Sequence, residues 1–245
     1  MTAPSRSPAR GGGTLHRPAL PPVTRGLLAR VVAAGVLLYL VLAAVGLLLT
    51  RVFGDSAIIG FDDRVNTWIV PRRTATLDAA TDLGSSLADT GTAIAVTVVA
   101  AVALRVWLGR WRESAVVVAA IAGELFVFLL VTNTVDRRRP PVQQLDEAPS
   151  TSSFPSGHTA AAVALFGCLA VVLLRRLASR RLARVLAVLL WTVPVVVAVS
   201  RVYRGMHYPS DVFFGFVGGG TWLTVVVLAL LPARGHPGRT VTAGD

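Results

Sequence analysis

Six long apolar runs, separated by shorter polar segments, dominate the pattern along the chain. They cover residues 31–50, 83–106, 114–133, 158–174, 183–202 and 212–231. About 20 consecutive, mainly apolar residues are enough for a helix to cross a lipid bilayer. The second run is the weakest of the six, because Asp89 falls within its first turns. The pattern predicts an all-α fold, a polytopic membrane bundle of six transmembrane helices.

The two ends of the chain differ in composition from the apolar runs. Residues 1–25 are rich in Pro, Gly, Arg and Ser, which is typical of a disordered basic tail, and residues 233–245 have a similar character. The first apolar run is longer than the apolar region of a secretory signal peptide and lacks a clear cleavage site. We therefore expect one membrane domain, residues 26–232, between two short tails.

Composition and charge support the membrane class. Hydrophobic residues fill 53% of the 245 positions and charged residues 15%, with a mean hydropathy of +0.64, whereas a soluble domain carries about 25% charged residues. The net charge is +11, and all 24 basic residues are arginine. A nucleic-acid-binding protein would gather this charge on one face of a soluble fold. Here the arginines separate apolar runs, so we expect a bilayer and not a nucleic acid as the partner.

The distribution of arginine predicts the orientation of the spans. With both termini in the cytoplasm, the inner segments hold 15 of the 24 arginines and the outer segments hold 9, as the positive-inside rule favours. The polar clusters that follow the third and fifth runs, and both histidines outside the tails, His158 and His207, then share the outer lip. We expect a multi-pass protein of the cell membrane with cytoplasmic termini and an active site at the extracytoplasmic lip.

The stretch PSGH, residues 155–158, stands where the fourth run begins. Ser156 is a good helix N-cap, and the backbone N–H groups of Gly157 and His158 have no partner in the first turn. Free amides at the positive end of a helix dipole attract anions, and glycine lets an anion approach the backbone closely. A plain helix cap with an incidental histidine is the competing interpretation.

The stretch SRVYRGMHYPSD, residues 200–211, follows the fifth run. Pro209 is tolerated in a helix's first turn, so His207 and Asp211 can lie on one side of the start of the last span. A carboxylate on one imidazole nitrogen leaves the other free to act as base or nucleophile. Arg139 and Arg201 reach the same lip from different spans, and a guanidinium fork suits phosphate. The joint arrangement predicts a phosphate site with its own nucleophile and acid.

These residues resemble the motifs of the type 2 phosphatidic acid phosphatase superfamily of membrane lipid phosphatases. That family shows a lysine, six residues and Arg-Pro; then Pro-Ser-Gly-His; then Ser-Arg, five residues, His, three residues and Asp. The second motif stands here as Pro155-Ser156-Gly157-His158, and the third as Ser200-Arg201, His207 and Asp211. The first motif is only partly present: Arg139-Pro140 matches its Arg-Pro pair, but Thr132 stands at the position of the lysine.

The resemblance implies a metal-independent hydrolase without a cofactor that acts on a lipid phosphate monoester or diphosphate, such as a polyprenyl diphosphate, phosphatidate or phosphatidylglycerol phosphate. It implies that His207 is the nucleophile and forms a phosphohistidine, that Asp211 orients it, and that His158 is first the acid and then the base. It places the phosphate oxygens among Arg139, Ser156, Gly157, Ser200 and Arg201. A covalent intermediate divides one difficult displacement into two easier steps.

Thr132 is the departure from the family pattern that matters most. The chain contains no lysine, and threonine brings no charge to replace the missing cation. We expect Arg137, Arg138 or Arg204 to turn inward and supply the third positive charge.

Three other functions compete with this interpretation. Vanadate-dependent haloperoxidases have a similar pocket, but those relatives are soluble. A phosphotransferase would pass the phosphoryl group to an alcohol and not to water. A non-enzymatic transporter or membrane scaffold draws support from Glu124 in the third run, because carboxylates within a membrane often mark ion paths. A hydrogen bond between helices is the alternative role for Glu124.

Overall fold

The computed structural model describes residues 24–53 and 56–231, and within these ranges the chain is helical and has no strands. The helices are α1 (Arg25–Leu47), α2 (Ala57–Ile69), α3 (Ala75–Ser86), α4 (Thr90–Leu108), α5 (Arg112–Thr134), α6 (Gly157–Arg176), α7 (Arg180–Tyr203) and α8 (Pro209–Leu230). A short π-helix, η1 (Leu48–Val52), follows α1, and a short 3-10 helix, η2 (Val70–Arg72), follows α2. The expected tail 233–245 and nearly all of the expected tail 1–25 lie outside the described residues.

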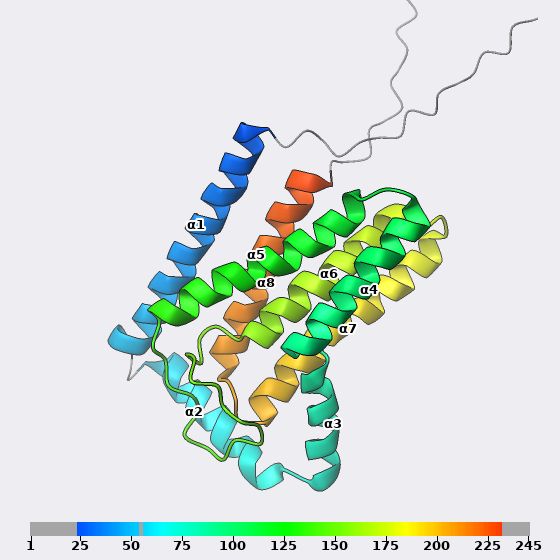
Figure 1. Cartoon of the computed structure of the whole chain (residues 1–245). Coiled ribbons are helices and arrows are strands. Elements are labelled where there is room, and N and C mark those ends of the chain that lie inside the picture. The colour runs from blue at the N-terminus through cyan, green and yellow to red at the C-terminus, as the bar shows by residue number, and fades with distance from the viewer. Residues whose placement is uncertain (1–23, 54–55, 232–245) are drawn as a thin grey trace, which may run out of the picture.

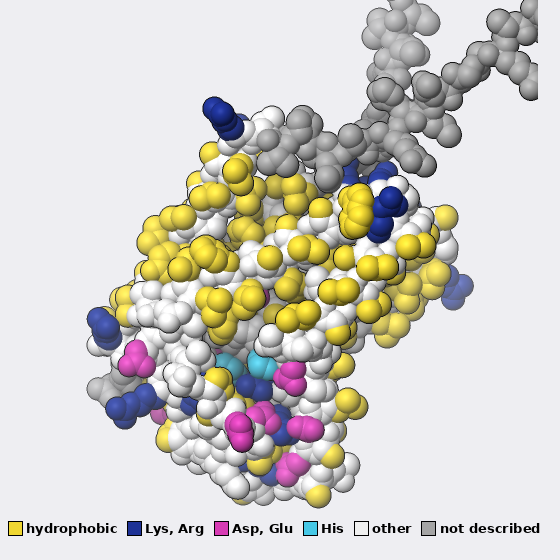
Figure 2. Space-filling view, in the orientation of Figure 1, with side chains coloured by type: hydrophobic (Ala, Val, Ile, Leu, Met, Phe, Trp, Pro, Cys, Tyr) yellow, Lys and Arg dark blue, Asp and Glu magenta, His cyan; other side chains and the backbone are white. Residues whose placement is uncertain are grey.

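Six of these helices are long and apolar enough to cross a membrane, which confirms the six predicted spans: α1 with η1, and α4 to α8. Large apolar side chains cover the outside of the spans, and Leu37, Val99 and Val188 are each more than 60% exposed. An apolar surface of this extent suits lipid and not water. Figure 2 shows it as a broad band across the molecule, with charged side chains gathered toward the two ends.

The second span begins later than the sequence predicts. The run 83–106 joins the end of one helix to most of another, because α3 ends at Ser86 and α4 begins only at Thr90. Asp89 has the extended backbone of an N-cap residue, a position that aspartate favours over a helix interior. The carboxylate therefore lies at the polar end of α4 and not inside the span.

Two helices that the sequence analysis did not predict, α2 and α3, lie at one end of the bundle together with the 135–156 segment (Figure 1). Helix α2 buries Asp62 and Asn66, while its Phe61 and Trp68 are exposed. An apolar outer face on a helix at this level fits the lipid–water interface. Helix α3 packs against α7. The two helices cover the end of the bundle where the motif residues gather.

Helix α6 is the centre of the bundle and packs against α5, α7 and α8. Two glycines let α8 approach it closely, because a Cβ at Gly219 would lie 2.5 Å from the Ala160 carbonyl oxygen, and one at Gly215 would lie 2.8 Å from that of Ser156. Small residues at a helix crossing allow this proximity in membranes. The beginnings of α6 and α8, which carry the two complete motifs, are thereby held against each other.

Candidate active site

A cavity of about 670 Å³ lies at the end of the bundle that α3 and the 135–156 segment cover. Its polar part is lined by four basic side chains, Arg139, His158, Arg201 and His207, and by four acidic ones, Asp82, Asp89, Asp146 and Glu147. Its apolar part is lined by α4, α5 and α6 through Ala93, Ile94, Ile121, Leu125, Phe128 and Ala161. Ligand sites commonly have about this volume, and this one joins a polar end to an apolar crevice.

His207 stands in the turn between α7 and α8. Gly205 has φ +72°, a left-handed conformation that glycine adopts at no steric cost, and it turns the chain so that His207 lines the cavity. The Nδ1 atom of His207 lies 2.7 Å from the Ser153 carbonyl oxygen. Because a carbonyl only accepts hydrogen bonds, Nδ1 carries the proton, and Nε2 is left with a free lone pair when the ring is neutral.

Asp211 acts on His207 at a distance and not through a direct hydrogen bond. Its Oδ2 lies 3.7 Å from His207 Nδ1, while Oδ2 accepts hydrogen bonds from the Ser153 hydroxyl at 2.5 Å and the Tyr208 amide at 2.9 Å. Burial lowers the pKa of His207 from 6.5, and the negative charge of Asp211 opposes this shift. The imidazole is therefore neutral at pH 7, as a nucleophile requires.

Arg137 lies behind Asp211 and not in the cavity. Its Nη1 donates to Asp211 Oδ1 at 2.5 Å, and its Nη2 donates to Asp62 Oδ2 at 2.8 Å. Asp62, in α2, also accepts hydrogen bonds from the amide of Ser210 at 3.0 Å and from its hydroxyl. All three charged side chains are at least 95% buried. They form a chain of paired charges, the Asp62–Arg137–Asp211 network, which links α2 to the start of α8.

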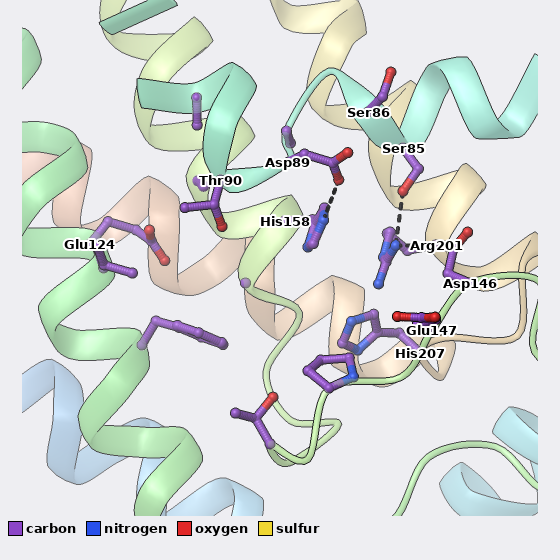
Figure 3. Close-up of a pocket in the computed structure, with 18 of the residues that line it drawn as sticks. Ser85, Ser86, Asp89, Thr90, Glu124, Asp146, Glu147, His158, Arg201 and His207 are labelled. Atoms are coloured by element: carbon purple, nitrogen blue, oxygen red, sulfur yellow. Dashed lines mark hydrogen bonds and ion pairs between the residues drawn. The ribbon is translucent and has the colours of Figure 1, made fainter. Parts of the chain in front are cut away.

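His158 projects from the first turn of α6 into the same cavity. Its Nε2 lies 2.9 Å from Asp89 Oδ1, at the start of α4. Figure 3 shows this pair together with Arg201 and His207 around one space. An ionised carboxylate only accepts hydrogen bonds, so Nε2–H of His158 donates to Asp89. Nδ1 is then the ring nitrogen left for proton transfer with a ligand.

Arg139 and Arg201 line the polar part of the cavity and are only partly committed to the protein. Arg139 donates to the Met206 carbonyl at 2.7 Å, and Arg201 donates to the Ser85 hydroxyl at 2.8 Å and to Asp146 at 2.9 Å. In the described part of the chain, the buried Nε atom of each guanidinium has no hydrogen-bond partner. Buried donors in proteins rarely go unpaired, so these two are available to an anion.

The structure brings some of the predicted phosphate contacts to the cavity and not others. Gly157 lines it, but Ser156 is fully buried and caps α6, with its hydroxyl 3.0 Å from that of Thr159. Ser200 is also buried and is absent from the cavity wall. The geometry therefore gives Ser156 a capping contact in place of the predicted position at the phosphate.

None of the three arginines expected to replace the family lysine lines the cavity. Arg137 is held by Asp62 and Asp211, Arg138 is exposed, and Arg204 pairs with Asp146 at 2.5 Å and with Asp82 at 3.0 Å. Thr132 is buried, and within the described ranges its hydroxyl has no partner. Acidic neighbours hold Arg137 and Arg204 away from the cavity, so the arrangement leaves the position of the third cation unfilled.

Several residues of the site lay outside the sequence motifs. Asp89 gave a signal, since it is a carboxylate inside an apparent span. Ser153 acts through its backbone and hydroxyl, and Asp62, Ser85 and Asp146 lie in segments without a recognisable pattern. Their partners are distant in the sequence, 55 residues away for Asp146 and Arg201 and 75 for Asp62 and Arg137. Only the packed fold reveals these pairs.

Two curated proteins similar to this chain are named as phosphatases. The chain is 32% identical over 117 residues to "Lipid phosphate phosphatase gamma" of Arabidopsis thaliana, covering 44% of this chain and 50% of that protein. It is 32% identical over 83 residues to "Phosphatidylglycerophosphatase B" of Bacillus subtilis (strain 168), covering 34% of this chain and 40% of that protein. The chain therefore spans half or less of the length of these curated relatives.

The fold is similar to that in the crystal structure of the first transmembrane PAP2 type phosphatidylglycerolphosphate phosphatase from Bacillus subtilis. The TM-score is 0.68 at 22% identity, and the match covers 79% of this chain and 92% of that one. The family model of the PAP2 superfamily matches residues 113–234, the region that holds α5 to α8 and every complete motif. By its sequence motifs, this match and its fold, the chain belongs to the PAP2 superfamily.

Proposed function

We propose that the protein is a membrane phosphatase that releases phosphate from a lipid phosphate monoester or diphosphate without a metal ion. The cavity carries the proposal: two histidines and two incompletely paired arginines line its polar part, which continues into an apolar crevice. A lipid can place its phosphate in the first and the start of its tail in the second. Phosphatidate, phosphatidylglycerol phosphate and polyprenyl diphosphates all have this form.

In the first chemical step, the free Nε2 of His207 attacks phosphorus, and the bond between phosphorus and the lipid oxygen breaks. His158 gives its proton to that oxygen, so the lipid leaves as an alcohol (or as a lipid monophosphate when the substrate is a diphosphate). The phosphoryl group remains on His207 as a phosphohistidine. The Ser153 carbonyl holds the His207 ring in the required tautomer, and Asp211 stabilises the positive charge that develops on it.

In the second step, His158 is neutral and takes a proton from a water molecule as the water oxygen attacks phosphorus. The bond between nitrogen and phosphorus breaks, inorganic phosphate leaves, and both histidines return to their starting state. Asp89 stabilises the imidazolium of His158 at the end of this step. One residue thus serves as acid and then as base.

Arg139, Arg201 and the amide of Gly157 are the proposed ligands of the equatorial phosphate oxygens. Charge spreads over these oxygens during phosphoryl transfer, and donors fixed before the reaction stabilise it. The Gly157 amide also lies at the N-terminus of α6, whose dipole favours an anion. A Cβ at Gly157 would lie 2.8 Å from the Phe128 ring, so a larger residue would disturb this wall of the cavity.

We place the cavity on the extracytoplasmic side of the membrane domain, residues 26–232. The distribution of the arginines, 15 of 24 in the segments assigned to the cytoplasm, supports this orientation. An outer-leaflet lipid could then enter the crevice between α4 and α5 with its tail still in the bilayer.

The proposed function is tested by measuring phosphate release from a panel of lipid phosphates, with the purified protein in detergent and EDTA. We expect turnover of at least one glycerolipid or polyprenyl substrate in EDTA. An absolute requirement for an added metal ion would overturn the metal-independent mechanism, and no release from any lipid phosphate would overturn the phosphatase assignment.

A further inference from the structure

Glu124 is a buried carboxyl group that the proposed chemistry leaves without a role. It lies in the middle of α5, is 5% exposed and lines the apolar part of the cavity. In the described part of the chain, no hydrogen bond or ion pair involves it. Figure 3 shows its side chain projecting from α5 toward the side of the cavity where Thr90 and His158 lie.

The position of Glu124 relative to the phosphate site follows from the helix geometry. Phe128 meets Gly157 where the apolar part of the cavity borders the polar part, and Glu124 lies four residues before Phe128 on α5. Four residues advance a helix by about 6 Å. Glu124 is therefore about one helical turn deeper in the bundle than the level where α6 begins beside His158.

An unpaired carboxyl group at this depth requires a polar partner. A buried, isolated carboxylate is costly, so the neutral acid, which has one O–H donor, is the form that suits an apolar crevice. The surrounding wall is apolar: Ile121 and Leu125 of α5 and Ile94 of α4 line the same part of the cavity. A ligand that fills the crevice must therefore bring a hydrogen-bond acceptor to Glu124.

The start of a lipid tail differs between the two classes of candidate substrate. In a diacylglycerol phosphate, ester carbonyl oxygens follow the phosphate after a few bonds and are acceptors. In a polyprenyl phosphate, the chain beyond the phosphate is hydrocarbon and offers none. The O–H of Glu124, one turn deeper than the phosphate site, can donate to an ester carbonyl of a diacylglycerol phosphate. A polyprenyl phosphate would leave this buried donor without a hydrogen-bond partner.

We propose that Glu124 forms a subsite for an ester carbonyl of an acylglycerol phosphate and so selects this lipid class over polyprenyl phosphates. The subsite rests on the proposed phosphatase function and gives it a substrate class. Glu124 is a specificity residue here, because it contacts the lipid backbone and not the reacting phosphate.

The test pairs a change in the protein with a change in the lipid. Diacylglycerol phosphate is compared with its dialkyl ether analogue, which lacks the carbonyl oxygens, as a substrate of the wild type and of Glu124→Leu and Glu124→Gln. We expect the wild type to favour the diacyl lipid about three- to tenfold in kcat/KM, the worth of one neutral hydrogen bond. Glu124→Leu should lose this preference, and Glu124→Gln should keep most of it because an amide also donates.

Ile121→Ala is the matched control. Ile121 lines the same crevice about one turn from Glu124 on α5 but has no polar group, so its loss should lower kcat/KM equally for the two lipids. Equal losses for both lipids in Glu124→Leu would instead show that Glu124 only supports packing, and unchanged values would also overturn the subsite.

A binding measurement separates the subsite from the chemistry. The thermal shift produced by a diacyl and by a dialkyl glycerol phosphonate, neither of which is hydrolysed, is measured for the same variants, since a ligand stabilises the folded state that binds it. A larger shift with the diacyl compound in the wild type, lost in Glu124→Leu, supports the subsite even if no substrate is hydrolysed. Equal shifts in the wild type overturn it whatever the activity.

Discussion

Replacing Arg137 tests whether the Asp62–Arg137–Asp211 network positions His207. The three side chains are at least 95% buried, and Arg137 bridges two carboxylates at 2.5 and 2.8 Å. Removing one partner from a buried ion pair costs about 3–5 kcal/mol, and here it would leave two carboxylates unpaired. We therefore expect Arg137→Gln to lower the free energy of unfolding by about this amount.

Arg137→Lys keeps the charge and is expected to fold, but it cannot span both carboxylates with a planar fork. The loss of one charge-assisted hydrogen bond is worth about 1.5–3 kcal/mol, which corresponds to about a ten- to hundredfold fall in kcat if Asp211 shifts. The inhibition constant of vanadate should change little, because Arg137 does not line the cavity. Arg138→Gln is the matched control from the same triplet: Arg138 is exposed, and its loss should be nearly neutral.

The assays are lipid phosphate turnover, vanadate inhibition and thermal unfolding in detergent. A vanadate inhibition constant raised more than about tenfold in Arg137→Lys, with kcat preserved, would refute the positioning role. That result would place Arg137 at the phosphate, as the sequence analysis expected of one member of the triplet. A loss in Arg138→Gln as large as in Arg137→Lys would also contradict the network.

Three further predictions follow from the site. His158→Ala should lower turnover of a lipid phosphate about 10²- to 10⁴-fold. Dinitrophenyl phosphate should still transfer its phosphoryl group to this variant, because the dinitrophenolate leaving group needs no proton. If the variant also loses that transfer, His158 is not the acid. Burial lowers the pKa of His207 from 6.5, so the acidic limb of kcat/KM that this histidine causes should lie below pH 6.5. The contribution of His207 to stability should also fall as pH decreases below 6.5, because the unfolded chain then binds more protons. An acidic limb above pH 6.5 would exclude His207 as its source. A reporter fused to the C-terminus should be active only in the cytoplasm, and activity only outside would reverse the proposed orientation.

The sequence predicted the spans well because bilayer thickness fixes their length, and the six apolar runs correspond to six helices. It missed α2 and α3 because these helices are shorter, and their buried positions, such as Asp62 and Ser85, are polar. It also placed the start of the second span too early, because Asp89, an N-cap type of residue that lies at the break between Ser86 and Thr90, was counted within the run.

The motif spacing identified residues that line one cavity, among them His158, His207, Arg139 and Arg201. The motif spacing could not show which contacts position these side chains. The Ser153 carbonyl contacts His207 across 54 positions of the chain, and a backbone group leaves no trace in the residue pattern. Arg137 was expected in the pocket because of its charge alone, whereas its position depends on Asp62, which packing brings from α2.

We propose that His207 carries the phosphoryl group between the two chemical steps, and trapping that phosphohistidine tests its role most directly. The His158→Ala protein, in which the second step lacks its base, is incubated in EDTA with dinitrophenyl phosphate carrying radioactive phosphorus and then quenched with alkali. We predict a label that is stable in base and labile in acid, that maps by mass spectrometry to His207, and that is absent when His207 is also changed to alanine. A label on any other residue, or release of dinitrophenol at the same rate without His207, would contradict the account.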